Sequence, residues 1–153
     1  MSPPLPLRFA SPEIPLPLVP VLINGQGPHH LLIDTGNGEA EPILFRPIAA
    51  DLGLVAHSER EEPGVLGVVR TARARLDRLE VGAIRRSTVE AILLDELPLP
   101  PVTLRPAGIL GYGFFRDFRL VIDYPNGTLE FAASHGAEAP AGSPSSWDLP
   151  SPT

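Results

Sequence analysis

The chain has 153 residues, a formal net charge of -6, a pI near 5.1 and a hydrophobic content of 43%. This length suits one domain with a real core, and the acidic balance argues against a nucleic-acid surface. The absence of cysteine excludes disulfides, thiol catalysis and cysteine-based metal sites. The four histidines lack the spacing of a metal ligand set, so we expect neither a metal nor a cofactor.

The start of the chain predicts no targeting segment. No cluster of positive charge precedes an apolar stretch, and the early prolines would break the helical core of a signal peptide. No apolar run reaches the length of about 20 residues that spans a bilayer. We therefore expect a cytoplasmic protein without a membrane span, unless a misplaced start has removed an export segment.

Proline and small residues mark both ends of the chain. Residues 1–13 are proline-rich and expected to be extended. Residues 133–153 combine proline, glycine, alanine and serine, a composition typical of a flexible tail. The folding unit is then residues 14–132, without an internal repeat.

Short apolar runs separated by turn signals fill this unit. Asn24-Gly25-Gln26-Gly27 and Pro125-Asn126-Gly127 predict hairpin turns, because Asn and Gly tolerate positive φ. Many short strands with little helix predict an all-β domain. In chain order we predict strands over 16–23, 30–34 and 42–45, a helix over 47–54, strands over 70–81 and 87–94, a helix over 112–118, and strands over 118–124 and 128–132.

An acidic residue closes the apolar run Leu31-Leu32-Ile33. Asp34 is followed by Thr35 and Gly36, which form a tight turn. A carboxylate at the end of a buried strand costs free energy unless hydrogen bonds or chemistry compensate for it. Much later, a second apolar run over 107–110 is closed by Gly111. The Asp-Thr-Gly triplet becomes informative about function because this second run occurs in the same chain.

Four pieces of sequence, in their order and spacing, resemble bacterial retropepsin-like aspartic proteases. The pieces are residues 19–25, 32–36, 108–111 and 114–127. The resemblance implies an all-β, retropepsin-like closed barrel with one or two short helices, assembled as a two-fold dimer. It also implies an aspartic endopeptidase that hydrolyses peptide or protein substrates with water activated between two carboxylates sharing one proton.

The resemblance also assigns roles to individual residues. Asp34 would be the catalytic carboxylate, and Thr35 would hydrogen-bond to the loop of a partner subunit. The glycine-flanked segment 63–67 resembles the flap that closes over substrate. The implied loop-support residues are Thr35, Gly36, Ile109, Leu110 and Gly111, and the implied substrate-binding residues are Asn37, Gly64, Val65, Leu66 and Gly67.

The chain carries a single Asp-Thr-Gly triplet. Asp51-Leu52-Gly53 is the nearest other candidate, but it lies in a predicted helix. Asp123 adjoins the Pro-Asn-Gly turn, where capping the turn is its expected role. One chain therefore supplies half of a catalytic pair, so a protease of this kind must be a homodimer with one Asp34 from each subunit.

Two positions depart from the family pattern. Asn37 stands where a small residue usually follows the triplet, and Gly113 stands where an acidic or amide side chain is common. Gly113 removes a side chain that could have braced the start of the following helix. In viral relatives the chain ends form an intersubunit sheet, whereas here a proline-rich start and a long tail flank the domain.

Two other classes of function are compatible with these residues. The first is a catalytically silent retropepsin-like module that binds peptides or dimerises. The second is an unrelated, monomeric β-barrel binding domain in which Asp34 merely caps a turn. A Ser-His-Asp hydrolase is a weaker alternative, because His57 and Ser58 are sequence neighbours and the chain has no nucleophile-elbow pattern.

Overall fold

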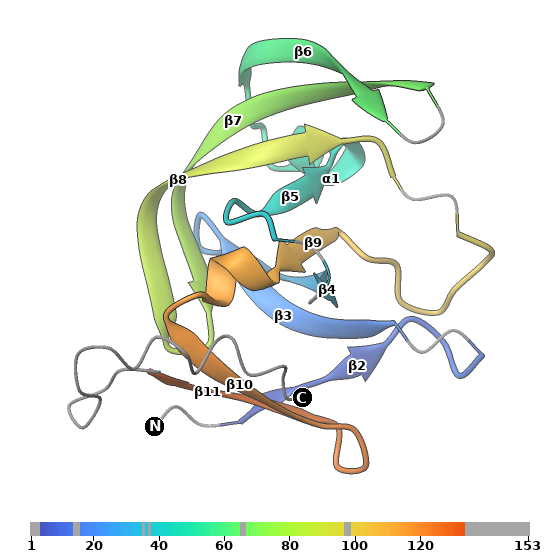
Figure 1. Cartoon of the computed structure of the whole chain (residues 1–153), viewed down its shortest axis with the longest axis vertical. Helices are drawn as coiled ribbons and strands as arrows, with labels where there is room; N and C mark the ends of the chain where they lie inside the picture. The colour runs from blue at the N-terminus through green and yellow to red at the C-terminus, as the bar shows by residue number, and fades with distance from the viewer. Residues whose placement is uncertain are drawn as a thin grey trace.

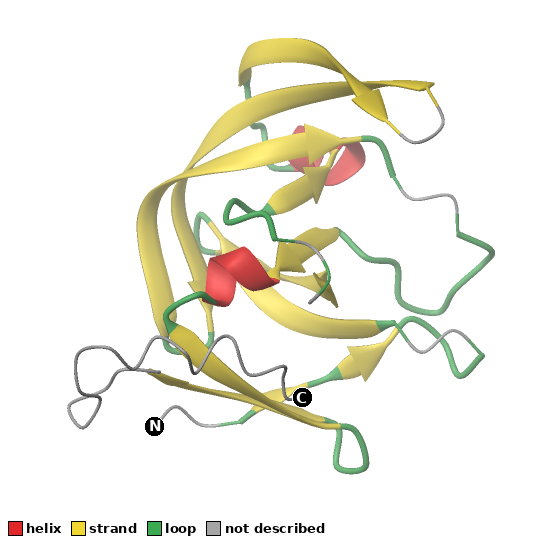
Figure 2. Cartoon of the chain, viewed as in Figure 1, coloured by secondary structure: helices red, strands yellow, loops and turns green. Residues whose placement is uncertain are grey.

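The fold is a closed β-barrel flanked by a small second sheet (Figure 1). The computed structural model describes residues 4–13, 16–34, 36, 38–64, 67–96 and 99–133. Strands dominate, and the helical structure in the described ranges is one short α-helix and one 3-10 turn (Figure 2). Neither is long and apolar enough to cross a membrane. The all-β prediction is confirmed.

The elements follow one another with short connections. In chain order they are β1 (Leu5–Pro6), β2 (Arg8–Phe9), β3 (Pro17–Ile23), β4 (Gln26–Asp34), β5 (Ile43–Phe45), α1 (Arg46–Asp51), β6 (Ala56–Gly64), β7 (Gly67–Val81), β8 (Ile84–Leu94), β9 (Gly108–Gly111), the 3-10 helix η1 (Tyr112–Phe115), β10 (Phe118–Asp123) and β11 (Thr128–Ala133).

The main sheet has the strand order β2-β3-β4-β9-β5-β8-β7-β6, and an additional β3–β7 pairing closes six of these strands into a barrel. Closure joins Leu22 to Glu80 and Ile23 to Leu79. Two of the pairings are parallel, β4 with β9 and β5 with β8. The other pairings in this barrel are antiparallel, so the barrel mixes both kinds of ladder.

The predicted turn between the first two long strands is confirmed, with a tighter shape than expected. β4 begins at Gln26, which leaves Asn24 and Gly25 as a two-residue loop with φ of 52° and 79°. Positive φ at both positions matches the twist of the flanking strands. The Asn24 side-chain oxygen also accepts hydrogen bonds from the amides of Asp77 and Arg78 at 2.8 and 3.0 Å. The turn is therefore anchored on β7.

Alternating side chains build two apolar clusters from the same strands. Leu31 and Ile33 of β4 face the barrel interior, whereas Leu32 between them faces outward. The outer cluster is covered by Val102 and Leu104 from the β8–β9 connection. The Leu104 amide donates to the Ala10 carbonyl at 2.9 Å, which fastens this cover to the start of the chain.

The N-terminal segment takes part in both sheets. β1 pairs with β11, and β2 pairs with β3. Leu7 and Ala10 are buried, so this segment contributes to the core although the sequence placed it outside the folding unit. It is extended in the structure, as expected. Of the predicted tail, residues 134–153 lie outside the described part of the chain.

Three strands begin earlier than the sequence predicted, and one long strand was missed. β4 starts at Gln26, β7 at Gly67 and β8 at Ile84. The missed strand is β6, whose sequence AHSEREEPG is almost entirely polar. Among the described strands it pairs only with β7, at the edge of the sheet, and it projects from the barrel, so it needs no apolar face. Apolar periodicity cannot detect such a strand.

Gly108 allows β9 to be paired on both sides. A Cβ at this position would lie 2.0 Å from the Ile43 carbonyl oxygen of β5. We expect Gly108→Ala to lower the free energy of unfolding by about 3 kcal/mol, because the backbone must move to admit the methyl group. Gly53→Ala is the control, since nothing lies within 4 Å there and only its φ of +71° opposes a side chain. Urea unfolding measures both; equal losses would contradict the steric explanation.

Glu90 of β8 links two strands through ion pairs. Its carboxylate contacts His57 Nε2 at 2.7 Å and Arg75 Nε at 3.5 Å. The pKa of Glu90 lies below its ordinary value, chiefly because of the hydrogen bond from His57. Its contribution to stability is therefore complete above the pKa of an unfolded glutamate, about 4.3, and is lost as the pH falls through the lower folded value.

We expect the urea midpoint of His57→Ala to lie below that of the wild type at about pH 5.5, where the Glu90 carboxylate is ionised and its hydrogen bond with His57 is in place. The difference should shrink as the pH falls to about 3, because Glu90 then becomes protonated in both proteins. Midpoints measured across this range test the pair. A difference that stays constant with pH would show that His57 acts through packing instead.

Candidate active site

Asp34 is the last residue of β4 and lies beside the end of β9. The parallel register pairs Ile33 with Leu110 and Asp34 with Gly111. Leu110 is fully buried in the barrel, whereas Ile109 belongs to the outer cluster. The predicted loop-support residues Ile109, Leu110 and Gly111 are thus brought next to Asp34, with the two apolar side chains on opposite faces of the sheet. The Asp34 side chain itself is half-buried.

The turn after Asp34 folds back onto its carboxylate. The Gly36 amide donates to Asp34 Oδ1 at 3.0 Å. A backbone donor to a carboxylate is a charge-assisted hydrogen bond, which fixes the orientation of the side chain. Two of the predicted residues in this turn, Thr35 and Asn37, lie outside the described residues.

Gly113 supports this loop through its lack of a side chain. A Cβ at Gly113 would lie 2.3 Å from the Gly38 carbonyl oxygen and 2.8 Å from the Glu39 carbonyl carbon. The backbone of η1 therefore packs directly against the segment that follows the Asp34 turn. The sequence suggested that Gly113 leaves the start of the helix without a supporting side chain. In the structure this position requires glycine, because the loop occupies the space that a side chain would need.

Tyr112 covers the other nearby glycine. A Cβ at Gly38 would lie 3.3 Å from Tyr112 Cε2, so the aromatic ring sits against the backbone of Gly38. Tyr112 remains partly exposed. Sequence reasoning did not single out Gly38 or Tyr112 as supports of the loop. The glycines at 36, 38 and 113 were the available signal for these supports, because glycine is common where two backbone segments approach closely.

The predicted flap lies at the tip of the β6–β7 hairpin. This hairpin extends away from the barrel in Figure 1, and its register pairs Gly64 with Gly67 and Pro63 with Val68. Gly67 has a φ of +126°, a conformation that favours glycine. Val65 and Leu66 lie outside the described residues. Val68 and Val69 are exposed apolar side chains beside the tip.

Charged contacts connect the hairpin to the barrel near the active-site loop. Arg73 of β7 forms an ion pair with Glu41, which lies between the Asp34 turn and β5. The hydrogen bond to Glu41 is the main reason that the pKa of Arg73 is raised. Arg46 at the start of α1 donates to the Arg70 carbonyl oxygen at 3.4 Å and contacts Asp95 at 3.3 Å. The base of the hairpin is thus attached to the residues just before and just after β5.

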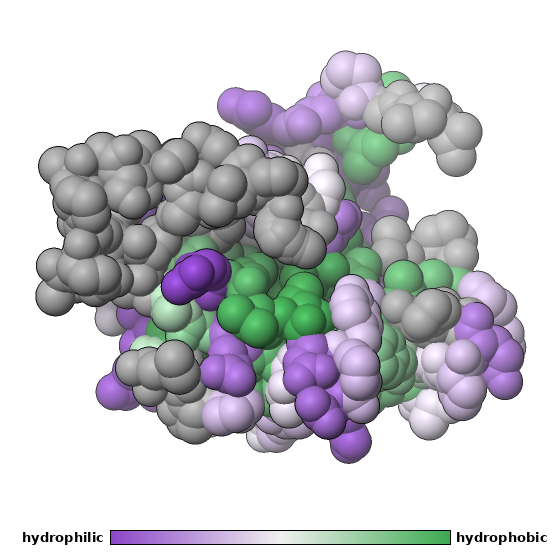
Figure 3. Space-filling model, turned by 60° about the horizontal axis from the view of Figure 1, so that its bottom comes forward, coloured by the Kyte–Doolittle hydropathy of each residue, from purple (hydrophilic) through white to green (hydrophobic). Residues whose placement is uncertain are grey.

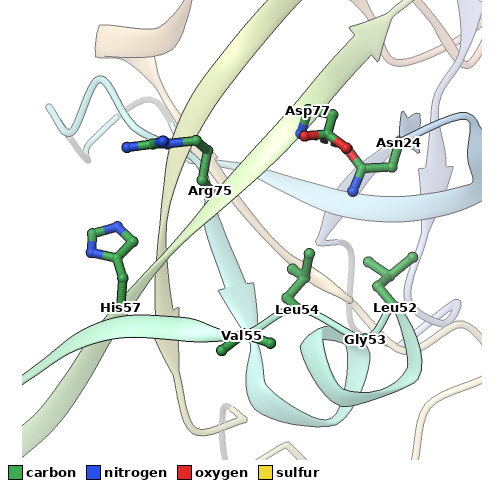
Figure 4. A pocket seen from close by; sticks show the side chains of 8 residues that line it. All are labelled: Asn24, Leu52, Gly53, Leu54, Val55, His57, Arg75 and Asp77. Carbon is green, nitrogen blue, oxygen red and sulfur yellow. Dashed lines mark hydrogen bonds between the residues drawn. The ribbon is translucent and has the colours of Figure 1, made fainter.

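A cavity of about 400 Å³ lies elsewhere, between the α1–β6 connection and β7 (Figure 4). None of the predicted site residues lines it. The apolar side chains of Leu52 and Leu54 and the polar groups of His57 and Arg75 border it, but Arg75 and His57 are both engaged by Glu90. Within the described ranges, no group of three or more His, Cys, Asp or Glu residues could hold a metal ion.

Asp34 is half-buried at the end of a barrel strand. A glycine turn holds its carboxylate, and a second strand closed by glycine lies beside it. This arrangement is the one expected of the class of retropepsin-like folds. The aspartyl protease family model matches residues 19–114, which is more than half of the chain. The chain belongs to this aspartyl protease family. A search of curated proteins gave no match.

Two solved structures are similar to this chain to different degrees. The chain is similar to the crystal structure of a retropepsin-like aspartic protease from Rickettsia conorii, with a TM-score of 0.57 and 14% identity over 86% of this chain and 90% of that one. It also aligns with the EIAV protease complexed with the inhibitor HBY-793, with a TM-score of 0.46 and 23% identity over 67% of this chain and 86% of that one. The first likeness establishes a retropepsin-like fold.

The contact at Gly113 yields a test of the loop. We expect Gly113→Asn to lower the free energy of unfolding by about 3 kcal/mol, because the new side chain collides with the backbone of Gly38 and Glu39. Gly53→Asn is the control, since Asn tolerates positive φ and that position is open. Urea unfolding compares the two variants. Wild-type stability in Gly113→Asn would mean that the loop moves aside at no cost.

Proposed function

We propose that this chain is an aspartic endopeptidase that works as a two-fold homodimer, with one Asp34 from each subunit. The observation that carries the proposal is the position of Asp34 at the end of β4, in register with Gly111 and hydrogen-bonded by the Gly36 amide. A carboxylate oriented by backbone donors on a rigid strand is suited to a chemical role. The chain carries one Asp-Thr-Gly, so the second carboxylate comes from a second copy.

In the proposed dimer the two Asp34 carboxylates share one proton, because two negative charges about 3 Å apart are strongly disfavoured. The ionised carboxylate takes a proton from a bound water as that water attacks the scissile carbonyl carbon. The protonated carboxyl group donates to the carbonyl oxygen and stabilises the tetrahedral intermediate. Proton transfer to the departing amine then completes the cleavage, and the apparent pKa values belong to the pair.

The hairpin suits the role of a cover for an extended peptide. A substrate strand would lie between the hairpin and the Asp34 pair, held by main-chain hydrogen bonds with side chains in alternate pockets. Val68 and Val69 offer apolar contact near the tip. The Arg73–Glu41 ion pair would keep the base of the hairpin in place while its tip moves.

We expect Asp34→Asn to remain folded and to lose all detectable cleavage of a peptide library from about pH 3 to about pH 8. The wild type should cleave with a bell-shaped pH dependence, because one carboxylate must be ionised and the other protonated. Asp51→Asn is the matched control, since Asp51 ends α1 and is exposed.

Each outcome separates the possible functions. Cleavage by the wild type and by Asp51→Asn, but not by Asp34→Asn, supports the proposal. Cleavage that persists in Asp34→Asn would refute the assignment of the carboxylate pair. A folded wild type without activity at any pH would favour a catalytically silent module of the same fold.

A further inference from the structure

The side chain of Asp34 lies on the outer face of the barrel sheet. Successive side chains of a strand point to opposite faces, so Asp34 shares its face with Leu32, two residues earlier in β4. The register carries this face across the sheet, because Leu32 is paired with Ile109 and Ile109 with Ile43. Ile43 is in turn paired with Ile92 of β8, and these four apolar side chains all belong to the outer cluster. The outer face therefore runs from Asp34 to the strand that adjoins the hairpin.

The same face continues onto the β6–β7 hairpin. Ile92 is paired with Arg73 of β7. Thr71 and Val69 follow Arg73 at two-residue steps toward the tip, so their side chains share its face. Glu62 of β6 is paired with Val69 and accepts a hydrogen bond from Thr71 Oγ1 at 3.3 Å. The hairpin therefore presents Glu62 and Val69 on the face that carries Asp34.

Glu62 and Val69 together form a surface that is partly acidic and partly apolar. Val69 is 39% exposed and the Glu62 side chain is 46% exposed, so both can contact a ligand. The hydrogen bond from Thr71 reaches Oε2 of Glu62 and orients its carboxylate. Arg60 lies 4.0 Å from the same oxygen, and its side chain is 71% exposed, so this ion pair is weak. The carboxylate is held in place and keeps most of its charge for a ligand.

The surroundings of Glu62 are charged and open. Figure 3 shows the hairpin projecting from the body of the molecule, with hydrophilic side chains along much of its length. Arg73, on the same face, is engaged by Glu41 in an ion pair. Its positive charge is therefore largely neutralised and does not oppose a cation beside Glu62.

A basic side chain matches this surface. Lysine and arginine carry a long apolar stem and a charged head, so the stem can lie against Val69 while the head reaches the Glu62 carboxylate. Glutamine has a shorter stem and no charge, and glutamate would be repelled by Glu62. The pairing of one valine with one oriented carboxylate therefore distinguishes these side chains.

We propose that Glu62 is a specificity-determining residue, which selects a lysine or arginine side chain in the peptide held beneath the hairpin. Val69 contacts the stem of that side chain. This inference rests on the proposed function, because it places the peptide between the hairpin and Asp34. It goes further by naming the chemical class of one substrate side chain and the carboxylate that recognises it. In the proposed homodimer, each hairpin selects one such side chain.

The selection can be measured without cleavage in the full-length Asp34→Asn chain. Fluorescein-labelled octapeptides of alanine, valine and serine carry one lysine, glutamine or glutamate, moved through every position. Fluorescence anisotropy at neutral pH gives the dissociation constant of each peptide. We expect lysine to bind about fivefold more tightly than glutamine at one or two positions, because a half-exposed ion pair contributes up to about that factor. Glutamate at the same positions should bind less tightly than glutamine.

Two substitutions of Glu62 and one matched control assign the effect. Glu62→Gln keeps the shape of the side chain and should reduce the lysine preference to less than about twofold. Glu62→Lys should reverse the preference, so that glutamate binds more tightly than glutamine. Glu61→Lys makes the same charge change at the exposed neighbour on the opposite face of β6. It should leave the lysine preference within about twofold of that in the parent chain.

The outcomes separate this selection from the proposed chemistry. A lysine preference that depends on Glu62 and not on Glu61 supports the inference, even if the wild type cleaves no peptide and the proposed function fails. Equal binding of lysine and glutamine peptides at every position overturns it, even if cleavage requires Asp34. A preference that survives Glu62→Gln, or that Glu61→Lys abolishes equally, also overturns it, as does a folded Asp34→Asn chain that binds none of the peptides.

Discussion

The parallel pairing of β4 with β9 is the constraint on which the site depends. It brings Asp34 to the end of a strand whose neighbours are buried on both faces, and it aligns the carboxylate with Gly111. β9 is short and is bounded by glycines. Because Gly108 has no side chain, β5 can pair with the other side of β9. A side chain there would separate β5 from β9, and the barrel would lose its closure beside Asp34.

Backbone contacts continue this arrangement beyond the sheet. Gly113 lets η1 pack against the segment after the Asp34 turn, and Tyr112 covers Gly38 from outside. These contacts hold the loop beside Asp34, as the proposed pairing of two carboxylates at short range would require. The hairpin is attached differently. Charged side chains hold its base, and Gly64 and Gly67 flank its tip. The loop after Asp34 is therefore held by backbone packing, whereas the hairpin is attached by charged side chains.

The second sheet joins the two ends of the described chain. β1 and β11 pair within one chain, so among the described residues β10 is paired on one side only. Natural proteins usually protect such edges with charge, bulges or a covering element. Here the edge strand carries Arg119 and Asp123 on either side of the exposed Val121.

The sequence by itself determined the features that depend on local chemistry. The Asn24-Gly25 turn follows from tolerance of positive φ at both residues, and the turn between β10 and β11 follows from that tolerance at Gly127. The apolar strand that ends at Asp34 follows from its residues, and the Asp123 cap follows from the adjacent turn. Only the tertiary structure decided the rest. The polar strand β6 carries no apolar pattern, and β1 and β2 have two residues each, so their pairing with β7, β11 and β3 is visible only in the folded chain. The need for glycine at 113 likewise arises from a contact with Gly38, far away in the chain, and such contacts exist only once the barrel has closed.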